Sequence, residues 1–216
     1  MHNYTVKHMK RAALIWDSPL LFSRLLSDSG YQCDEVTPHL LAAPFFRGNY
    51  SVIVVPGGFG EPKYSRVLPA LKALAPRFKR YVSNGGIVLL FGAASENQDV
   101  YQWLISGISY HFGFFEAEII PKHSESTSTT PLLPVADKDS DSSNVYYFDG
   151  YLTCDETVPH PFQVLASAVY PDTCIEVPVC ISIQKENGVI FISTIHEYPT
   201  PTFLAQITHD GSDTSF

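Results

Sequence analysis

The chain has 216 residues, 45% of them hydrophobic and 17% charged, so it can bury one sizeable core and fits a single domain over 1–216. A formal net charge of −8 argues against nucleic acid or an anionic membrane as the main partner, because both bind through clustered Lys and Arg. No apolar run approaches the roughly 20 residues that span a bilayer, and residues 1–11 lack the apolar segment of a secretory signal. We therefore expect a cytoplasmic protein.

The first half of the chain alternates strand-like and helix-like segments. Short apolar runs predict strands over 12–16, 31–36, 51–55 and 87–91. Apolar residues at helical spacing predict helices over 20–26 and 66–82, and Pro76 should either kink the second helix or begin another. Because strands that alternate with helices form βαβ units, we predict an α/β fold with a doubly wound, mostly parallel sheet and flanking helices.

The second half is richer in strands. After a helix predicted over 97–105, strand-like runs follow at 114–120, 146–154, 162–170, 175–184 and 189–195, a pattern that predicts antiparallel hairpins. Asn187-Gly188 marks the clearest hairpin turn, because both residue types accept positive φ angles. Residues 122–144 are dominated by Ser, Thr and Asp, so we expect a long flexible surface loop there.

Cysteine and histidine spacing gives no sign of metal or redox chemistry. The four cysteines, at positions 33, 154, 174 and 180, form no Cys-x-x-Cys pair, and we expect them to be reduced thiols. The eight histidines show no His-x-x-His spacing, and the sequence has neither a Gly-x-Gly-x-x-Gly nor a Walker motif. We predict no bound metal and no cofactor.

Three segments end in residues suited to a site at the carboxyl edge of a parallel sheet, where ligands of such folds bind. A glycine turn follows the strand over 51–55, Gly92 follows the strand that begins after Gly85-Gly86, and His196-Glu197 follows the last strand. The predicted ligand contacts are Gly57, Gly58, Phe59, Gly92, Ala93 and His196. Asp17, Glu61 and Tyr64 are further polar candidates for the same rim.

This combination resembles the class I glutamine amidotransferase-like superfamily, most closely its biotin-protein ligase N-terminal domain-like branch. That family carries a Pro-Gly-Gly turn, a Gly-Gly-x-x-Leu-Gly-x-Cys-x-Gly elbow and a late His-Pro-Glu. The resemblance covers about 11–100 and 188–204 and implies a flavodoxin-like fold. It also implies that the turn at Gly57-Gly58 forms an oxyanion hole, that Gly92 stands where the family has its cysteine nucleophile, and that His196 stands at the catalytic histidine.

The chain departs from the family at two of these three motifs. Neither Gly92 nor its neighbour Ala93 can act as a nucleophile. Glu197 follows His196 directly, and because adjacent side chains of an extended segment point to opposite faces, Glu197 is not expected to orient the imidazole. We therefore regard His196, Gly92 and Glu197 as vestigial catalytic positions and predict no glutaminase activity.

The leading functional hypothesis is a non-catalytic amidotransferase-like protein that binds a small molecule or a protein partner at the former active-site edge. One alternative is a hydrolase or amidase that uses His196 with Asp17, Glu61 or a water. A third is a structural subunit, including a homo-oligomer, whose exposed aromatic residues form an interface. An open pocket with His196 turned inward would favour either of the first two.

Overall fold

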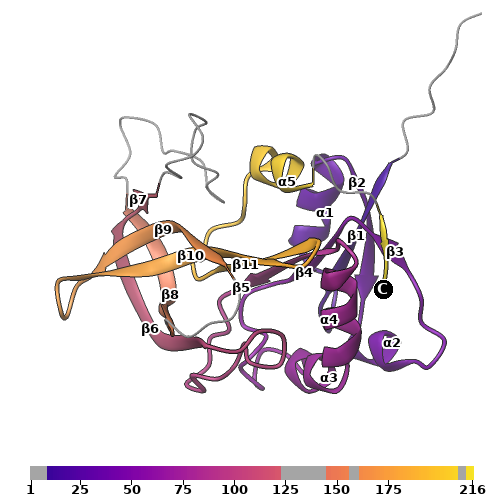
Figure 1. The fold of residues 1–216 in the computed structure, drawn as a ribbon, viewed down its shortest axis with the longest axis horizontal. Coiled ribbons are helices and arrows are strands. Elements are labelled where there is room, and N and C mark those ends of the chain that lie inside the picture. The colour runs from indigo at the N-terminus through magenta and orange to yellow at the C-terminus, as the bar shows by residue number, and fades with distance from the viewer. Residues whose placement is uncertain (1–8, 123–144, 156–160, 209–212) are drawn as a thin grey trace, which may run out of the picture.

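The computed structural model describes residues 9–122, 145–155, 161–208 and 213–216. Its centre is an eight-stranded mixed sheet with the order β2-β1-β4-β5-β11-β10-β9-β7 (Figure 1). A two-stranded ribbon, β6 with β8, and a short pair, β3 (Asn49–Tyr50) with β12 (Thr214–Ser215), lie outside this sheet.

Five neighbouring strands of the sheet run parallel to one another. They are β2 (Tyr31–Val36), β1 (Lys10–Ile15), β4 (Val52–Val55), β5 (Ile87–Phe91) and β11 (Gly188–Ser193). Every residue of β4 and β5 is buried. This explains why both strands are continuous apolar runs, since strands covered on both faces do not alternate in polarity.

The remaining three strands extend the sheet in antiparallel pairs: β10 (Ile175–Lys185), β9 (Phe162–Tyr170) and β7 (Ile120–Pro121). The predicted hairpin between β10 and β11 is present, with Lys185 opposite Gly188. The positive φ of its two-residue turn lies at Glu186 (φ 53) and not at Gly188. Gly188 is required for another reason, because an added Cβ would lie 2.1 Å from the carbonyl oxygen of Val82.

Short helices cover the parallel part of the sheet on both faces. They are α1 (Leu21–Asp28), α2 (Pro38–Ala42), α3 (Val67–Ala73), α4 (Ala75–Ser83) and α5 (Pro201–Ile207). Buried side chains of α2, α3 and α4 join one core cluster, whereas those of α1 and α5 join the other. The predicted break is confirmed: α3 ends at Ala73, and Pro76 lies in the first turn of α4.

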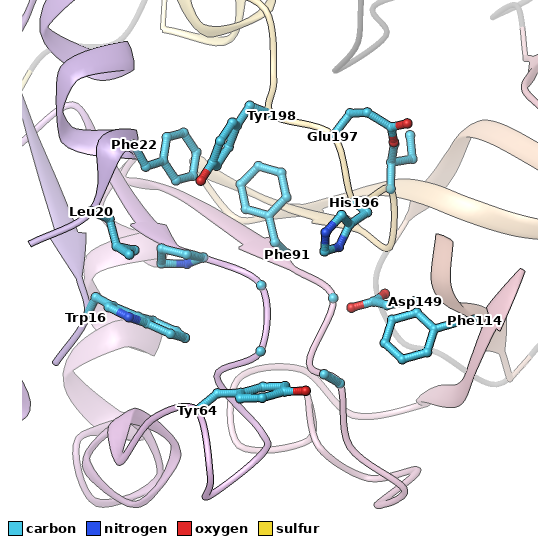
Figure 2. Close-up of a pocket in the computed structure, with 16 residues that line it drawn as sticks. Trp16, Leu20, Phe22, Tyr64, Phe91, Phe114, Asp149, His196, Glu197 and Tyr198 are labelled. Atoms are coloured by element: carbon cyan, nitrogen blue, oxygen red, sulfur yellow. The ribbon is translucent and has the colours of Figure 1, made fainter. Parts of the chain in front are cut away.

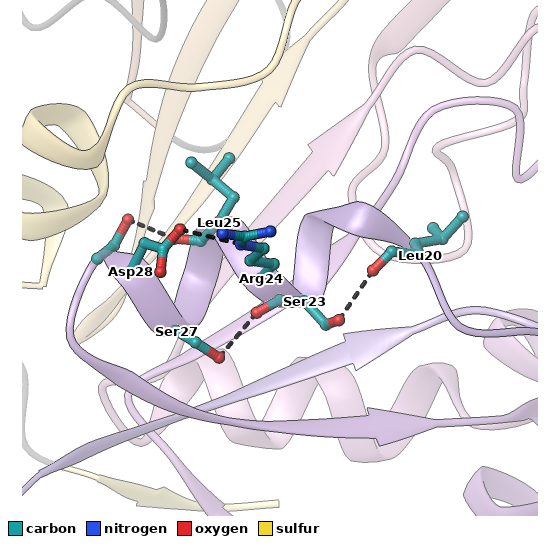
Figure 3. A network of polar contacts seen from close by, with 7 residues as sticks. Leu20, Ser23, Arg24, Leu25, Ser27 and Asp28 are labelled. Carbon is teal, nitrogen blue, oxygen red and sulfur yellow. Dashed lines mark hydrogen bonds and ion pairs between the residues drawn. The ribbon is translucent and has the colours of Figure 1, made fainter.

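The helix α1 begins without a side-chain cap, and serine hydroxyls satisfy carbonyl groups along its outer face (Figure 3). Ser23 donates to the carbonyl of Leu20 at 2.8 Å, and Ser27 donates to that of Ser23 at 2.9 Å. Arg24 and Asp28 form an exposed i,i+4 ion pair at 3.7 Å. The inner face carries Phe22, which is 1% exposed and reaches the edge of the sheet.

The ribbon of β6 (Ile108–Glu118) and β8 (Val145–Cys154) stands at the carboxyl end of the parallel strands. Its register breaks between Phe112, which faces Gly150, and Phe115, which faces Phe148. Gly113 and Phe114 therefore lie opposite the single residue Asp149, the arrangement of a β-bulge.

These observations correct the predicted fold class. The expected doubly wound, mostly parallel and helix-flanked architecture, flavodoxin-like in type, is wrong for the chain as a whole, because the sheet is mixed and the helices are few and short. Between the parallel neighbours β5 and β11, the described chain forms the strands β6 to β10 and no helix. The first half alone has the predicted strand and helix alternation.

Two local predictions also need correction. Residues 97–105 form successive turns, not a helix, with Val100 bonded to Asn97, Gln102 to Asp99 and Leu104 to Tyr101. The predicted loop over 122–144 lies outside the described residues except for Lys122, which is ion-paired with Glu176. Across the described part of the chain, no helix is long and apolar enough to cross a membrane.

Candidate functional site

A pocket of about 590 Å³ lies beyond the carboxyl ends of β1, β4, β5 and β11 (Figure 2). Its wall is made by the segments that follow those four strands, by the start of α1 and by the bulge of the β6–β8 ribbon. The lining residues are Trp16, Leu20, Phe22, Pro56, Gly57, Gly58, Tyr64, Phe91, Gly92, Ala94, Phe114, Asp149, Ile195, His196, Glu197 and Tyr198.

Most residues predicted from the sequence lie together in this wall. Gly57, Gly58, Gly92, His196 and Glu197 all line the pocket. The two other predicted contacts do not: Phe59 and Ala93 are both fully buried. Phe59 packs edge-on against the ring of Tyr101, at a centroid distance of 5.7 Å. Residues next to a turn alternate in direction, so only some of each predicted segment can face the pocket.

The glycine turn is hydrogen-bonded to the neighbouring segment. The N–H of Gly58 donates to the carbonyl oxygen of Gly92 at 2.7 Å, and the N–H of Gly60 donates to that of Ala93 at 2.9 Å. An oxyanion hole needs N–H groups that are free to meet the developing charge. The Gly58 N–H is already used, so it does not provide the donor that the family resemblance implies.

The strained position after β5 is Ala94, not Gly92. Ala94 has a φ of 50°, a left-handed conformation that is rare for alanine, and its methyl group lines the pocket. Turns follow it, without the helix that would complete a strand-to-helix elbow. Gly92, the expected nucleophile position, and Ala94, the position with a positive φ, therefore both lack a nucleophilic side chain.

Gly92 makes room for a carboxylate that comes from the ribbon. A Cβ added at Gly92 would lie 1.9 Å and 2.0 Å from the two carboxylate oxygens of Asp149. Figure 2 shows this carboxylate directed towards the turn after β5. A side chain at position 92 and a carboxylate at position 149 thus exclude each other. Gly92→Leu, a natural choice for filling the pocket, would displace Asp149 and is not a clean test of binding.

Two hydrogen bonds of its backbone fix the position of Asp149. Its N–H donates to the carbonyl of Thr194 at 3.1 Å, next to the bridge between Phe148 and Ile195. Its own carbonyl accepts from the hydroxyl of Tyr110 at 2.7 Å. The same hydroxyl accepts from the N–H of Ala94 at 3.2 Å, so Tyr110 connects the ribbon to the turn after β5.

The Asp149 carboxyl group lies in an environment that disfavours its charge. The residue is 5% exposed, and its Oδ1 has no hydrogen-bond partner among the described residues. Burial raises the pKa of this carboxyl group to about 7, although Tyr110 and the backbone of Ala94 lower the pKa in part. At neutral pH the group is therefore poised between its protonated and ionised forms, the state that suits both proton transfer and cation binding.

His196 and Glu197 take different orientations at the opposite wall. The His196 N–H donates to the carbonyl of Tyr147 at 2.8 Å, and its ring is exposed and turned into the pocket (Figure 2). Glu197 Oε1 accepts from the N–H of Tyr147 at 3.2 Å, whereas its Oε2 is buried without a partner among the described residues. Glu197 thus holds the ribbon, and the expectation that it does not orient the imidazole agrees with this geometry.

Aromatic side chains form much of the remaining wall. Tyr198 packs on Phe22 at a centroid distance of 5.2 Å, and Phe22 packs on Phe91 at 5.5 Å. Three rings stay well exposed at the opening: Phe114 at 70%, Tyr64 at 63% and Tyr198 at 58%. Exposed rings at the mouth of a pocket are available for contact with a ligand.

Of the three further polar candidates, Tyr64 lines the pocket, whereas Asp17 and Glu61 do not. The Asp17 carboxylate accepts from the N–H of Arg66 at the start of α3, and Glu61 accepts from that of Lys63. All four cysteines are free thiols, and none lines the pocket. The described residues contain no group of His, Cys, Asp and Glu that could hold a metal ion.

Asp149 is the residue that sequence reasoning missed. A signal was present, because an aspartate inside the aromatic strand Tyr146-Tyr147-Phe148-Asp149 places a charge where a strand of this type is buried. What the sequence could not show is the bulge in β6, which aims this side chain at the edge of a different sheet.

Comparisons with known proteins give a fold but no family. No family model and no curated protein matches the chain. A β-galactosidase from Bacillus circulans sp. alkalophilus matches with a TM-score of 0.53 and 13% identity, over 94% of this chain and 31% of that one. The cytoplasmic proteins STM3548 and STM1381 of Salmonella typhimurium match with TM-scores of 0.53 and 0.52 at 13% identity, over 94% of this chain and 99% and 100% of theirs.

At this identity the likeness shows the fold alone. The chain spans about a third of the β-galactosidase and nearly the whole of each Salmonella protein. The amidotransferase-like resemblance is not addressed by any of these matches and stays a prediction.

Proposed function

We propose that this chain binds a small molecule in the pocket beyond β1, β4, β5 and β11, without cysteine-dependent amidotransferase chemistry. The observation that carries the proposal is the pocket itself, whose volume of about 590 Å³ lies within the ~300–1,000 Å³ typical of small-molecule sites. Mostly apolar walls with a few convergent polar groups, here Asp149, His196 and Glu197, are the usual composition of such sites.

The proposal is tested by filling the pocket from Gly57. This glycine is exposed, and an added Cβ would meet nothing closer than the Gly92 carbonyl oxygen at 3.5 Å. Gly57→Leu should therefore fold normally and place a side chain in the pocket. We expect hits from a fragment library, screened by ligand-observed NMR, to lose at least tenfold in affinity in this variant.

The matched control is Gly113→Leu. Gly113 does not line the pocket, and its added Cβ would also meet nothing closer than 3.5 Å, from the Tyr170 hydroxyl. Fragments that bind wild type, Gly57→Leu and Gly113→Leu equally well would place binding elsewhere and contradict the proposal.

A hydrolase or amidase stays the second candidate. The observation that favours it is Asp149, whose pKa of about 7 suits a general acid or base, in one pocket with His196. The residue set first considered, His196 with Asp17 or Glu61, is not brought together. Turnover of chromogenic ester, amide or glycoside substrates that disappears in both Asp149→Asn and His196→Ala would favour the enzyme.

A protein partner, or a second copy of the chain, remains a prediction from the aromatic content. Exposed rings on the ribbon, Phe114 at 70% and Tyr147 at 54%, support it. A cytoplasmic location is likewise a proposal, supported by the descriptions of the two Salmonella proteins.

A further inference from the structure

Apart from tyrosine, the ionisable side chains that the described residues contribute to the pocket wall are two acids and one histidine. Among the described residues, the lining holds two carboxylates, Asp149 and Glu197, together with His196, and it contains neither Lys nor Arg. The chain as a whole has a formal charge of −8. An anionic ligand entering this pocket would meet repulsion from both carboxylates, with no described Lys or Arg to offset it.

One oxygen of the Asp149 carboxylate lacks the partner that a buried charge needs. Its Oδ1 has no hydrogen-bond donor among the described residues, and only 5% of the residue is exposed. Buried carboxylates are ordinarily paired with a cation or with several N–H donors. Asp149 lines the pocket, so a ligand bound there can supply the missing partner (Figure 2).

The rings that line the same pocket suit a positive charge. Faces of Trp, Tyr and Phe attract cations through the negative potential of their π-systems, at ring distances up to about 6 Å. The aromatic lining residues are Trp16, Phe22, Tyr64, Phe91, Phe114 and Tyr198. A buried carboxylate in a pocket lined by several rings is an arrangement that recognises an organic cation better than a neutral or an anionic molecule.

We propose that the ligand of this pocket is a small organic ammonium ion with N–H donors and an apolar body, with its nitrogen at Asp149 and its body against the aromatic walls. This inference rests on the proposed small-molecule function. The N–H donors are part of it, because Oδ1 of the carboxylate lacks a hydrogen bond among the described residues and no cationic side chain lines the described part of the pocket. A neutral polyol would offer donors but would leave the buried charge uncompensated.

The test compares matched probes by isothermal titration calorimetry at about pH 8, where Asp149 is ionised and a primary amine is protonated. The probes are phenethylammonium, benzylammonium, the neutral 2-phenylethanol, the anionic phenylacetate and galactose. We expect at least one ammonium probe to bind at least tenfold more tightly than 2-phenylethanol, and phenylacetate not to bind measurably.

Asp149→Asn keeps the size of the side chain beside Gly92 and removes its charge. We expect this variant to lose at least tenfold in affinity for the ammonium probes and to bind 2-phenylethanol within twofold of wild type. The control Glu96→Gln removes an exposed carboxylate that does not line the pocket and should leave both affinities unchanged.

Three results would overturn the inference: no binding of either ammonium probe at millimolar concentration, equal binding of the amine and the alcohol, or ammonium binding that Asp149→Asn leaves intact. If galactose or 2-phenylethanol then binds in a way that Gly57→Leu abolishes, the pocket still takes a small molecule and only its cationic nature is wrong. If no library compound or probe responds to Gly57→Leu, the proposed function fails as well.

Discussion

At the scale of single residues, the pairing of Gly92 with Asp149 is the central feature of the site. The sequence suggests a nucleophile position that has become glycine. The structure adds the physical reason for glycine, because the carboxylate of Asp149 occupies the space of any Cβ at position 92. The absence of a side chain at position 92 and the presence of the Asp149 carboxylate beside it are thus explained by the same packing.

Asp149 should make the stability of the protein depend on pH. Its pKa is about 7 in the folded state and near 3.8 when solvated, so the folded state binds more protons between about pH 4 and 7. Stability is therefore lost as pH rises through this window. Asp149→Asn removes the cost of the buried charge and should stabilise the protein at pH 8 by on the order of 2 kcal/mol, with little gain at pH 4.

Urea unfolding at both pH values measures this difference. Glu96→Gln, at an exposed carboxylate, should follow the wild-type dependence. An Asp149→Asn variant with the same stability offset at pH 4 and at pH 8 would show that Asp149 is not a buried, uncompensated acid.

At the scale of elements, the hairpin between β10 and β11 shows how packing overrides the usual preference of a strand for alanine over glycine. Alanine is ordinarily preferred to glycine inside a strand by roughly 0.5–1 kcal/mol. At Gly188 an added Cβ would lie 2.1 Å and 2.4 Å from the backbone carbonyl oxygens of Val82 and Gly86. Backbone atoms cannot move aside without a large cost in free energy, so at this position alanine should be less stable than glycine.

Gly188→Ala should therefore destabilise the protein by about 2 kcal/mol or more. Gly113→Ala is the control, because its Cβ would be in ordinary contact at 3.5 Å, and it should stay within about 0.5 kcal/mol of wild type. The midpoints of urea unfolding give both values, and a Gly188→Ala midpoint equal to that of wild type would contradict the close packing of β11 on α4.

At the scale of the whole molecule, the chain should not release ammonia from glutamine. Neither Gly92 nor Ala94 offers a nucleophile, and no cysteine lines the pocket. Burial raises the pKa of the Cys180 thiol to about 12 and those of Cys33 and Cys154 to about 11, which keeps these thiols protonated and unreactive.

A coupled glutamate dehydrogenase assay for ammonia tests this prediction. We expect no turnover above the background of a heat-denatured sample. Ammonia release that vanishes when one of the four cysteines is replaced by serine would overturn the prediction. Replacing each cysteine in turn also tests a thiol that reaches glutamine only after a conformational change.

The sequence by itself determined where the strands of the first half lie, their order of appearance and the residues that follow their ends. Continuous apolar runs such as 51–55 and 87–91 leave little choice of structure, and glycine or histidine after each run marks the strand end. The break before α4 also followed from Pro76, which cannot donate a helical hydrogen bond. These are local properties, and local chemistry was enough to predict them.

Only the tertiary structure decided the mixed sheet and the presence of Asp149 in the pocket. A strand pattern reads the same whether its partner runs parallel or antiparallel, so the second half of the chain could not be assigned to one sheet or to a separate ribbon from its pattern. The position of Asp149 depends on a bulge in β6 and on hydrogen bonds to Thr194 and Tyr110, both distant in sequence. Contacts between distant segments depend on how the whole chain packs, and they could not be predicted from the residue pattern of a single sequence.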